Sequence, residues 1–194
     1  MQMMTDFFDA MLMNWPVWLV TVVLVVAAVI DGIQLKVPNW ITFPLVFSGW
    51  IYSAVAAGDM GMVWYEGLAW SLVGTVVGLA LLLPAYAIGG MGAGDVKLLM
   101  GVGAWMHSRH TFYAFCVSAV VGAVLAVAMV LIQKSFKKHA NQFRAILGEI
   151  LTIRDPSTLA AIAADRKPSM LLLPYGIPIA IGTIGYFYWM GMLI

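Results

Sequence analysis

Long apolar stretches follow one another along the chain, and six of them approach the length of a membrane-spanning helix. They lie at about 15–32, 41–57, 67–88, 96–108, 111–132 and 170–193. A helix needs roughly 20 mainly apolar residues to cross the hydrocarbon of a bilayer. The fourth stretch is short, so a tilted helix and a re-entrant helix both remain open for it. The pattern predicts an all-α, polytopic membrane helix bundle of about six transmembrane helices, in a single domain over 1–194.

The segment 133–169 has a different pattern, with apolar residues at helical spacing and basic residues on the other faces. The apolar positions are Phe136, Phe143, Leu147, Ile150 and Leu151. Such a pattern predicts an amphipathic helix on the inner leaflet. Asp155 and Pro156 resemble an N-cap followed by proline at the first helical position, which predicts a second short helix through Ala164.

Small residues recur at helical spacing inside the apolar stretches. The pairs are Gly74 with Gly78 and Ser71 with Thr75. Small side chains allow helix backbones to approach closely in a membrane. We therefore expect these four residues at helix contacts within one bundle.

Composition supports a membrane protein and excludes several function classes. The chain is 63% hydrophobic and 10% charged, which leaves too little polar surface to cover a soluble fold. A net charge of +1 gives no electrostatic case for a nucleic-acid partner. The single cysteine, Cys116, has no partner for a disulfide and is expected to be a small packed residue. The histidines lack the spacing of a metal site, and His107 and His110 are expected in an outer loop.

The distribution of basic residues predicts the orientation. If all six stretches cross the membrane, nine of the ten Lys and Arg residues fall on one side, and Arg109 alone falls on the other. Because cytoplasmic loops collect Lys and Arg, both termini are predicted outside. The connections 33–40, 89–96 and 133–169 are then cytoplasmic. A re-entrant fourth stretch would place the most basic loop outside, so the charges favour a crossing.

Two of the nine acidic residues, Asp31 and Asp95, are each placed at the inner end of a predicted span. Two close carboxylates cannot both ionise, so they share a proton; one can then activate water while the other donates to a carbonyl oxygen. Gly92 and Gly94 allow close approach of main chains beside Asp95. Lys97 can favour the charged form of Asp95, although a lysine is also expected there from the orientation rule.

Three segments resemble the type IV prepilin peptidase family. Residues 92–98, GAGDVKL, match its Gly-x-Gly-Asp-Val-Lys-Leu motif. Asp31 followed by Val37, Pro38 and Asn39 is similar to its first aspartate and downstream Ile-Pro-Asn. The run Pro174, Tyr175, Gly176 and Pro178 is similar to its proline-rich final helix. A plain alternative remains for both proline segments, because Pro38-Asn39 also starts or stops helices and the last run would break or kink the sixth helix.

The resemblance implies a function and a site. It implies an aspartic endopeptidase that cuts the basic leader from prepilins or pseudopilins, just before their hydrophobic helix, at the cytoplasmic face of the inner membrane. Asp31 and Asp95 match the catalytic pair, with Gly92, Gly94, Lys97, Pro38 and Asn39 as supporting residues and no metal or cofactor. The 33–40 connection is short and has no cysteine. This is similar to the compact, peptidase-only branch, such as Tad-type pilus or preflagellin peptidases, without methyltransferase activity.

Other readings stay open at this point. Presenilin and signal-peptide-peptidase-type proteases also use Gly-x-Gly-Asp, but residues 28–31 read Ala-Val-Ile-Asp where those enzymes have Tyr-Asp. A small proton-coupled carrier would use buried carboxylates to move protons, and it would need polar groups continuing toward the outer face. In a noncatalytic assembly subunit, Asp31 and Asp95 would be interface anchors.

Overall fold

The computed structural model describes residues 12–59, 61–87, 89–132, 148 and 174–193, and these residues form helices and connecting turns. The helices are α2 (Trp15–Gln34), α3 (Asn39–Asp59), α4 (Trp64–Ala87), α5 (Ala93–Ile132) and α8 (Gly176–Trp189). The all-α prediction is confirmed. The two helices predicted within 133–169 lie outside the described residues, apart from Gly148.

Five of the six predicted stretches match helices of the structure. Three correspond to α2, α3 and α4, and 96–108 and 111–132 correspond to the two parts of α5 on either side of the non-helical residue His107. Four helices are long and apolar enough to cross a membrane: α2, α3, α4 and residues Ala93–Met129 of α5. The last predicted span is shorter than expected, because α8 has only 14 residues.

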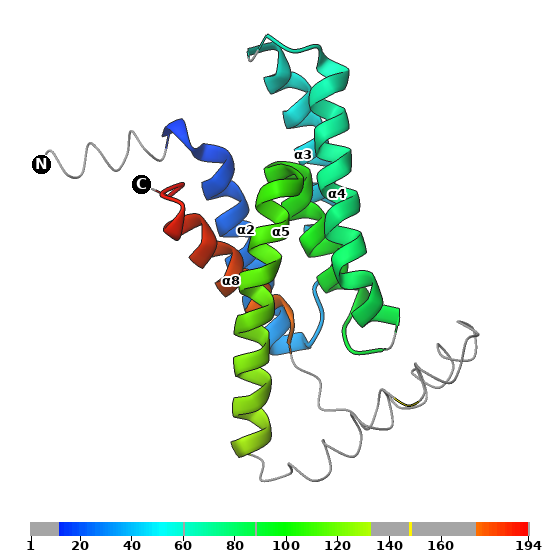
Figure 1. The fold of residues 1–194 in the computed structure, drawn as a ribbon, viewed down its shortest axis with the longest axis vertical. Helices are drawn as coiled ribbons and strands as arrows, with labels where there is room; N and C mark the ends of the chain where they lie inside the picture. The colour runs from blue at the N-terminus through cyan, green and yellow to red at the C-terminus, as the bar shows by residue number, and fades with distance from the viewer. Residues whose placement is uncertain (1–11, 60, 88, 133–147, 149–173, 194) are drawn as a thin grey trace, which may run out of the picture.

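A turn at His107 divides α5 into an N-terminal half, 93–106, and a C-terminal half, 108–132. His107 has φ 59° and ψ −179°, which is not helical. Figure 1 shows the chain reversing direction at this turn, between the two green halves of α5. The N-terminal half is about 21 Å long at a rise of about 1.5 Å per residue, which is shorter than the ~30 Å of bilayer hydrocarbon. It ends beside Gly74, near the middle of α4.

The two halves of α5 form the centre of the bundle and pack against different neighbours. The N-terminal half lies against α3 and α4, where Gly101 meets Leu45 and Gly78 meets Leu99. The C-terminal half lies against α8, where Ser118 Oγ is 3.3 Å from Ile179 O. α2 packs beside α8, as the blue and red helices of Figure 1 show. The reversal therefore places α5 between two helix pairs.

The predicted small-residue contacts are confirmed. A Cβ on Gly78 would lie 2.6 Å from Leu99 O, and one on Gly74 would overlap Gly103 O. Ser71 and Thr75 are buried on the same face of α4. A side chain at either glycine would therefore push α4 away from α5. By contrast, many large apolar side chains of the long helices are exposed, as lipid contact requires, among them Val25, Phe47, Val76 and Val124.

The prediction that His107 and His110 lie in an outer loop is wrong. Both residues are part of α5 and half-buried. His107 Nε2 lies 3.3 Å from Ser53 Oγ on α3, and His110 Nδ1 lies 2.8 Å from the Tyr186 hydroxyl on α8. The polar run His-Ser-Arg-His suggested a loop, but the chain reverses at a single residue and the helix resumes.

Candidate active site

Asp31 lies in the last turn of α2 and is buried, with 2% of its surface exposed. Its Oδ2 accepts a hydrogen bond of 2.7 Å from the backbone N–H of Gly176, the first residue of α8. The first N–H groups of a helix have no partner within the helix, and its dipole is positive there. Asp31 thus supplies from α2 the acceptor that the start of α8 needs.

Glycine at position 176 makes this contact possible. A Cβ added to Gly176 would lie 2.9 Å from Asp31 Oδ2 and 3.0 Å from Asp31 Cβ. Both distances are shorter than ordinary packing, and the Asp31 side chain is enclosed. Any side chain at 176 would therefore displace the carboxylate.

Asp95 lies in the first turn of α5 and is 5% exposed. Its Oδ2 accepts a hydrogen bond of 3.1 Å from the Gly92 N–H, three residues earlier. This is the reach-back contact of a capping box, in which an acidic residue in the first turn binds the N–H of the capping residue. Asp95 and Asp31 therefore share one arrangement, since each carboxylate lies at a helix N-terminus, which favours its charge although burial opposes it.

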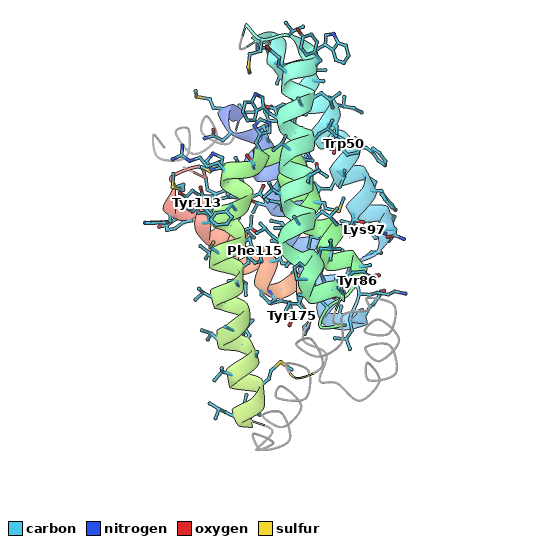
Figure 2. All side chains as sticks on the ribbon, turned by 45° about the vertical axis from the view of Figure 1, so that its right-hand side comes forward. Trp50, Tyr86, Lys97, Tyr113, Phe115 and Tyr175 are labelled. Carbon is cyan, nitrogen blue, oxygen red and sulfur yellow. The ribbon has the colours of Figure 1, made fainter. Side chains whose placement is uncertain are left out.

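Tyr175 lies near both carboxylates. It directly precedes Gly176, whose N–H binds Asp31. Burial first, and then the negative charge of Asp95, raise the pKa of the Tyr175 phenol, so the phenol stays protonated at neutral pH. Figure 2 shows Tyr175 at the same end of the bundle as Tyr86, near the end of α4. The structure thus brings Asp31 and Asp95, from two distant helices, to the Tyr175–Gly176 junction.

The predicted supporting residues surround the start of α5. Gly94 meets the α2–α3 connection, where a Cβ would lie 3.1 Å from Val37 Cβ. Lys97 Nζ donates a hydrogen bond of 2.9 Å to Asn39 Oδ1 and lies 4.6 Å from the centre of the Phe43 ring. These contacts connect the segment after Asp31 to the segment around Asp95.

The alternative in which Pro38-Asn39 starts a helix is confirmed. Asn39 begins α3, and Pro38 O accepts a hydrogen bond from Ile41 N. The predicted proline run coincides with the start of the last described helix, because Pro174 and Tyr175 are not helical and α8 begins at Gly176. Pro178 lies in the first turn of α8, where proline is tolerated. Tyr175 and Gly176 were not among the predicted site residues. The available signal was the Pro-Tyr-Gly-x-Pro run at a helix start.

In the described part of the chain, no three His, Cys, Asp or Glu residues lie close enough to form a metal site. Cys116 is half-buried and has a free thiol. The chemistry available at the Tyr175–Gly176 junction is therefore that of two carboxylates, backbone N–H groups and a phenol.

Comparisons with known proteins find one family model and several related proteins that match this chain. A family model described as the type IV leader peptidase family matches residues 18–127. The prepilin leader peptidase/N-methyltransferase of Aeromonas salmonicida is 28% identical over 132 residues, which cover 64% of this chain and 43% of that protein. The protein of the same name from Neisseria gonorrhoeae is 30% identical over 115 residues, 57% of this chain and 39% of that protein.

The chain thus matches less than half the length of these relatives, and no solved structure gives a significant match. The matched family region contains both Asp31 and Asp95. Together with the long apolar helices, the family indicates an integral membrane protein. Because the family model covers more than half of the chain, this protein belongs to the type IV leader peptidase family.

Proposed function

We propose that this protein is an aspartic endopeptidase that removes the leader peptide from type IV prepilin-like or pseudopilin substrates. The observation that carries the proposal is the position of two buried carboxylates, Asp31 and Asp95, at the Tyr175–Gly176 junction. The names of the related proteins support the substrate class.

The proposed reaction needs one proton shared by the two carboxylates. The ionised carboxylate takes a proton from water, and the protonated one donates a hydrogen bond to the scissile carbonyl oxygen. The resulting hydroxide adds to the carbonyl carbon. The tetrahedral intermediate then breaks its C–N bond as the leaving amine takes a proton from the pair. No covalent enzyme intermediate forms, and the pair returns to its starting protonation.

The N-termini of α8 and α5 stabilise negative charge on the two aspartates in this reaction. The Gly176 N–H holds Asp31, and the Gly92 N–H holds Asp95. Donors fixed in place before the reaction stabilise charge without having to reorganise during it. The two aspartates are best treated as a single titrating pair, because a shared proton belongs to neither alone.

We place the protein in the inner, cytoplasmic membrane with both termini outside and the carboxylates facing the cytoplasm. The sequence prediction places every Lys and Arg residue except Arg109 on the side of Asp31 and Asp95, and cytoplasmic connections collect such residues. Cysteine labelling tests this orientation. A cysteine at position 36 is expected to react from the cytoplasm and a cysteine at position 59 from outside, and the opposite pattern would invert the orientation.

We propose that the protein cleaves without methylating the new amino terminus. The connection between α2 and α3 is short, from Leu35 to Pro38, and contains no cysteine. Mass spectrometry of the processed substrate is the direct test. An unmethylated amino terminus is expected after co-expression with this protein alone, and a mass increase of one methyl group would refute this point.

Co-expression with a prepilin carrying a basic leader tests the main proposal. Asp31→Asn and Asp95→Asn keep the side-chain shape but remove the carboxyl group that can take up and release a proton, so each is expected to slow cleavage at least about 100-fold. Asp59→Asn, at the exposed end of α3, is the matched control and should cleave at the wild-type rate. Normal processing by both site variants, at equal enzyme abundance, would remove the assignment.

A further inference from the structure

An apolar cavity of about 280 Å³ lies between α4, the C-terminal half of α5 and the start of α8. Leu82 on α4, Leu99 and Phe115 on α5 and Tyr175 before α8 are among the residues that line it. Figure 2 shows Phe115 and Tyr175 in this region, between α4 and the C-terminal half of α5. Small residues of α5, among them Ala119 and Ala123, form one wall.

The residues that line the cavity favour the binding of an apolar group. The polar side chains among the lining residues are Ser118 and Tyr175. The Ser118 hydroxyl already donates to Ala114 O at 2.7 Å and lies 3.3 Å from Ile179 O. A polar ligand would therefore lose its hydration without gaining partners, whereas an apolar side chain would gain contacts.

The cavity lies next to the carboxylate site. Met91 lines it and directly precedes Gly92, whose N–H binds Asp95. Tyr175 also lines it and directly precedes Gly176, whose N–H binds Asp31. At the opposite wall, Ala119 and Ala123 are exposed on the outer surface of α5. A chain that enters this cavity from the bilayer would therefore lie beside the residues that precede Gly92 and Gly176.

We propose that this cavity is the subsite that receives the large apolar side chains directly following the scissile bond, where the hydrophobic segment of the substrate begins. This inference rests on the proposed function. The volume of about 280 Å³ lies just below the range of about 300–1,000 Å³ for small-ligand pockets, so the cavity has room for a few side chains and not for a whole peptide segment. The remainder of the substrate helix would then lie in the bilayer beside α5.

A substitution that fills part of the cavity tests the proposal, because it should affect a substrate with large side chains more than a substrate with small ones. Two versions of one prepilin are compared, with leucine or with alanine at the positions directly after the scissile bond. Ala123→Leu adds volume to the cavity wall, so KM for the leucine substrate is expected to rise about tenfold. KM for the alanine substrate and both kcat values should change less than about twofold, because its small side chains still fit.

Val124→Leu is the matched control, because Val124 is adjacent, 63% exposed and not part of the cavity lining. It should leave KM for both substrates unchanged. Equal losses in Ala123→Leu and Val124→Leu would indicate a general effect on membrane packing and overturn the proposal. Unchanged discrimination by Ala123→Leu would also overturn it, as expected if a lipid chain occupies the cavity.

Cross-linking separates this inference from the proposed function. In a Cys116→Ala, Asp95→Asn background, a cysteine after the scissile bond of the substrate is expected to cross-link to Ala123→Cys and not to Val124→Cys. If wild-type enzyme cleaves both substrates but this cross-link does not form, the subsite is wrong and the peptidase assignment stands. If wild-type enzyme cleaves neither substrate, both proposals fail.

Discussion

Two polar clusters inside this apolar bundle use hydrogen bonds in opposite ways. In the carboxylate site (Asp31, Asp95, Tyr175 and Gly176), carboxyl oxygens accept hydrogen bonds from backbone N–H groups at helix starts. In the central hydroxyl cluster (Trp50, Ser53, Ser71, Thr75 and His107), side-chain donors bind one another and backbone carbonyls. The first cluster lies beside a cavity, and the second lies within the contact of α3, α4 and α5.

The central hydroxyl cluster holds three helices together. Ser71 and Ser53 both donate to Ala104 O on α5, and Thr75 Oγ1 accepts from Trp50 Nε1 at 3.0 Å and donates to Ser71 O at 2.9 Å. These hydroxyls are uncharged and find their partners within the cluster. The comparison teaches that polar groups in a membrane bundle stabilise packing when they are neutral and mutually satisfied. Charges held at helix starts beside a cavity are the better guide to chemistry.

The turn at His107 connects the two clusters. Its positive φ of 59° is rare for a residue with a side chain, and such conformations cost about 1–3 kcal/mol. The Thr111 hydroxyl donates to His107 O at 2.6 Å, and Ser53 lies against the ring. This reversal brings the start of α5, with Asp95, and the cavity wall at 119–126 to the same end of the bundle.

The largest effect is expected from a substitution that disrupts the contact between α4 and α5 beside the central hydroxyl cluster. A Cβ at position 74 would overlap Gly103 O and lie 2.8 Å from His107 Cα, and neither backbone can move freely. Gly74→Ala is therefore expected to destabilise the bundle by more than about 2 kcal/mol, measured as reduced Tm and abundance in detergent. Gly58→Ala, where a Cβ has open space, is the control. Equal Tm values would contradict the observed helix contact.

The second prediction disturbs the carboxylate site while leaving the central hydroxyl cluster intact. Gly176→Ala pushes on the Asp31 carboxylate, so cleavage is expected to fall about 100-fold, as misplaced reacting groups commonly cause. Gly185→Ala lies in the same helix with nothing within 4 Å and should cleave normally. Kinetics on purified enzyme, with Tm as a folding check, provide the measurement. Wild-type kcat in Gly176→Ala would show that the Asp31 position is not required.

The third prediction separates stability from activity. Ser71→Ala removes a donor to Ala104 O and is expected to cost about 1 kcal/mol, seen as a lower Tm. Cleavage at a permissive temperature should stay at the wild-type rate, because the central hydroxyl cluster takes no part in the proposed chemistry. Ser48→Ala, whose hydroxyl binds Leu45 O within α3, is the control. A loss of kcat in Ser71→Ala would show that the central hydroxyl cluster also contributes to catalysis and would contradict this prediction.

The smallest effect concerns the exposed contact between Lys97 and Asn39. Lys97→Met removes the hydrogen bond to Asn39 and the contact with the Phe43 ring. Exposed contacts of this kind contribute about 1 kcal/mol or less, so cleavage should fall less than about threefold. A double-mutant cycle with Asn39→Ala measures the coupling. A loss as large as that in Asp95→Asn would move Lys97 into the catalytic machinery.

Much of the fold was predictable because the signal is local. Apolar runs long enough for a bilayer predicted α2, α3 and α4, and small residues predicted close helix contacts, which the structure shows between α4 and α5. A reversal between 108 and 111 was also predicted, but not a turn at the single residue His107, because no proline or glycine lies there and the polar run 107–110 is typical of a loop. The contacts of Asp31 with Gly176 and of Lys97 with Asn39 span 145 and 58 positions, and no sequence period reports such distances.

The sequence by itself determined the membrane class, the helical fold and the two acidic residues proposed for catalysis, since each depends on composition or on a short motif. The tertiary structure decided that α5 reverses at His107, that α8 starts against Asp31, and that an apolar cavity opens beside both carboxylates. These features depend on how separate helices pack. This packing depends on surfaces formed by residues that lie far apart in the chain, so no local sequence pattern shows it.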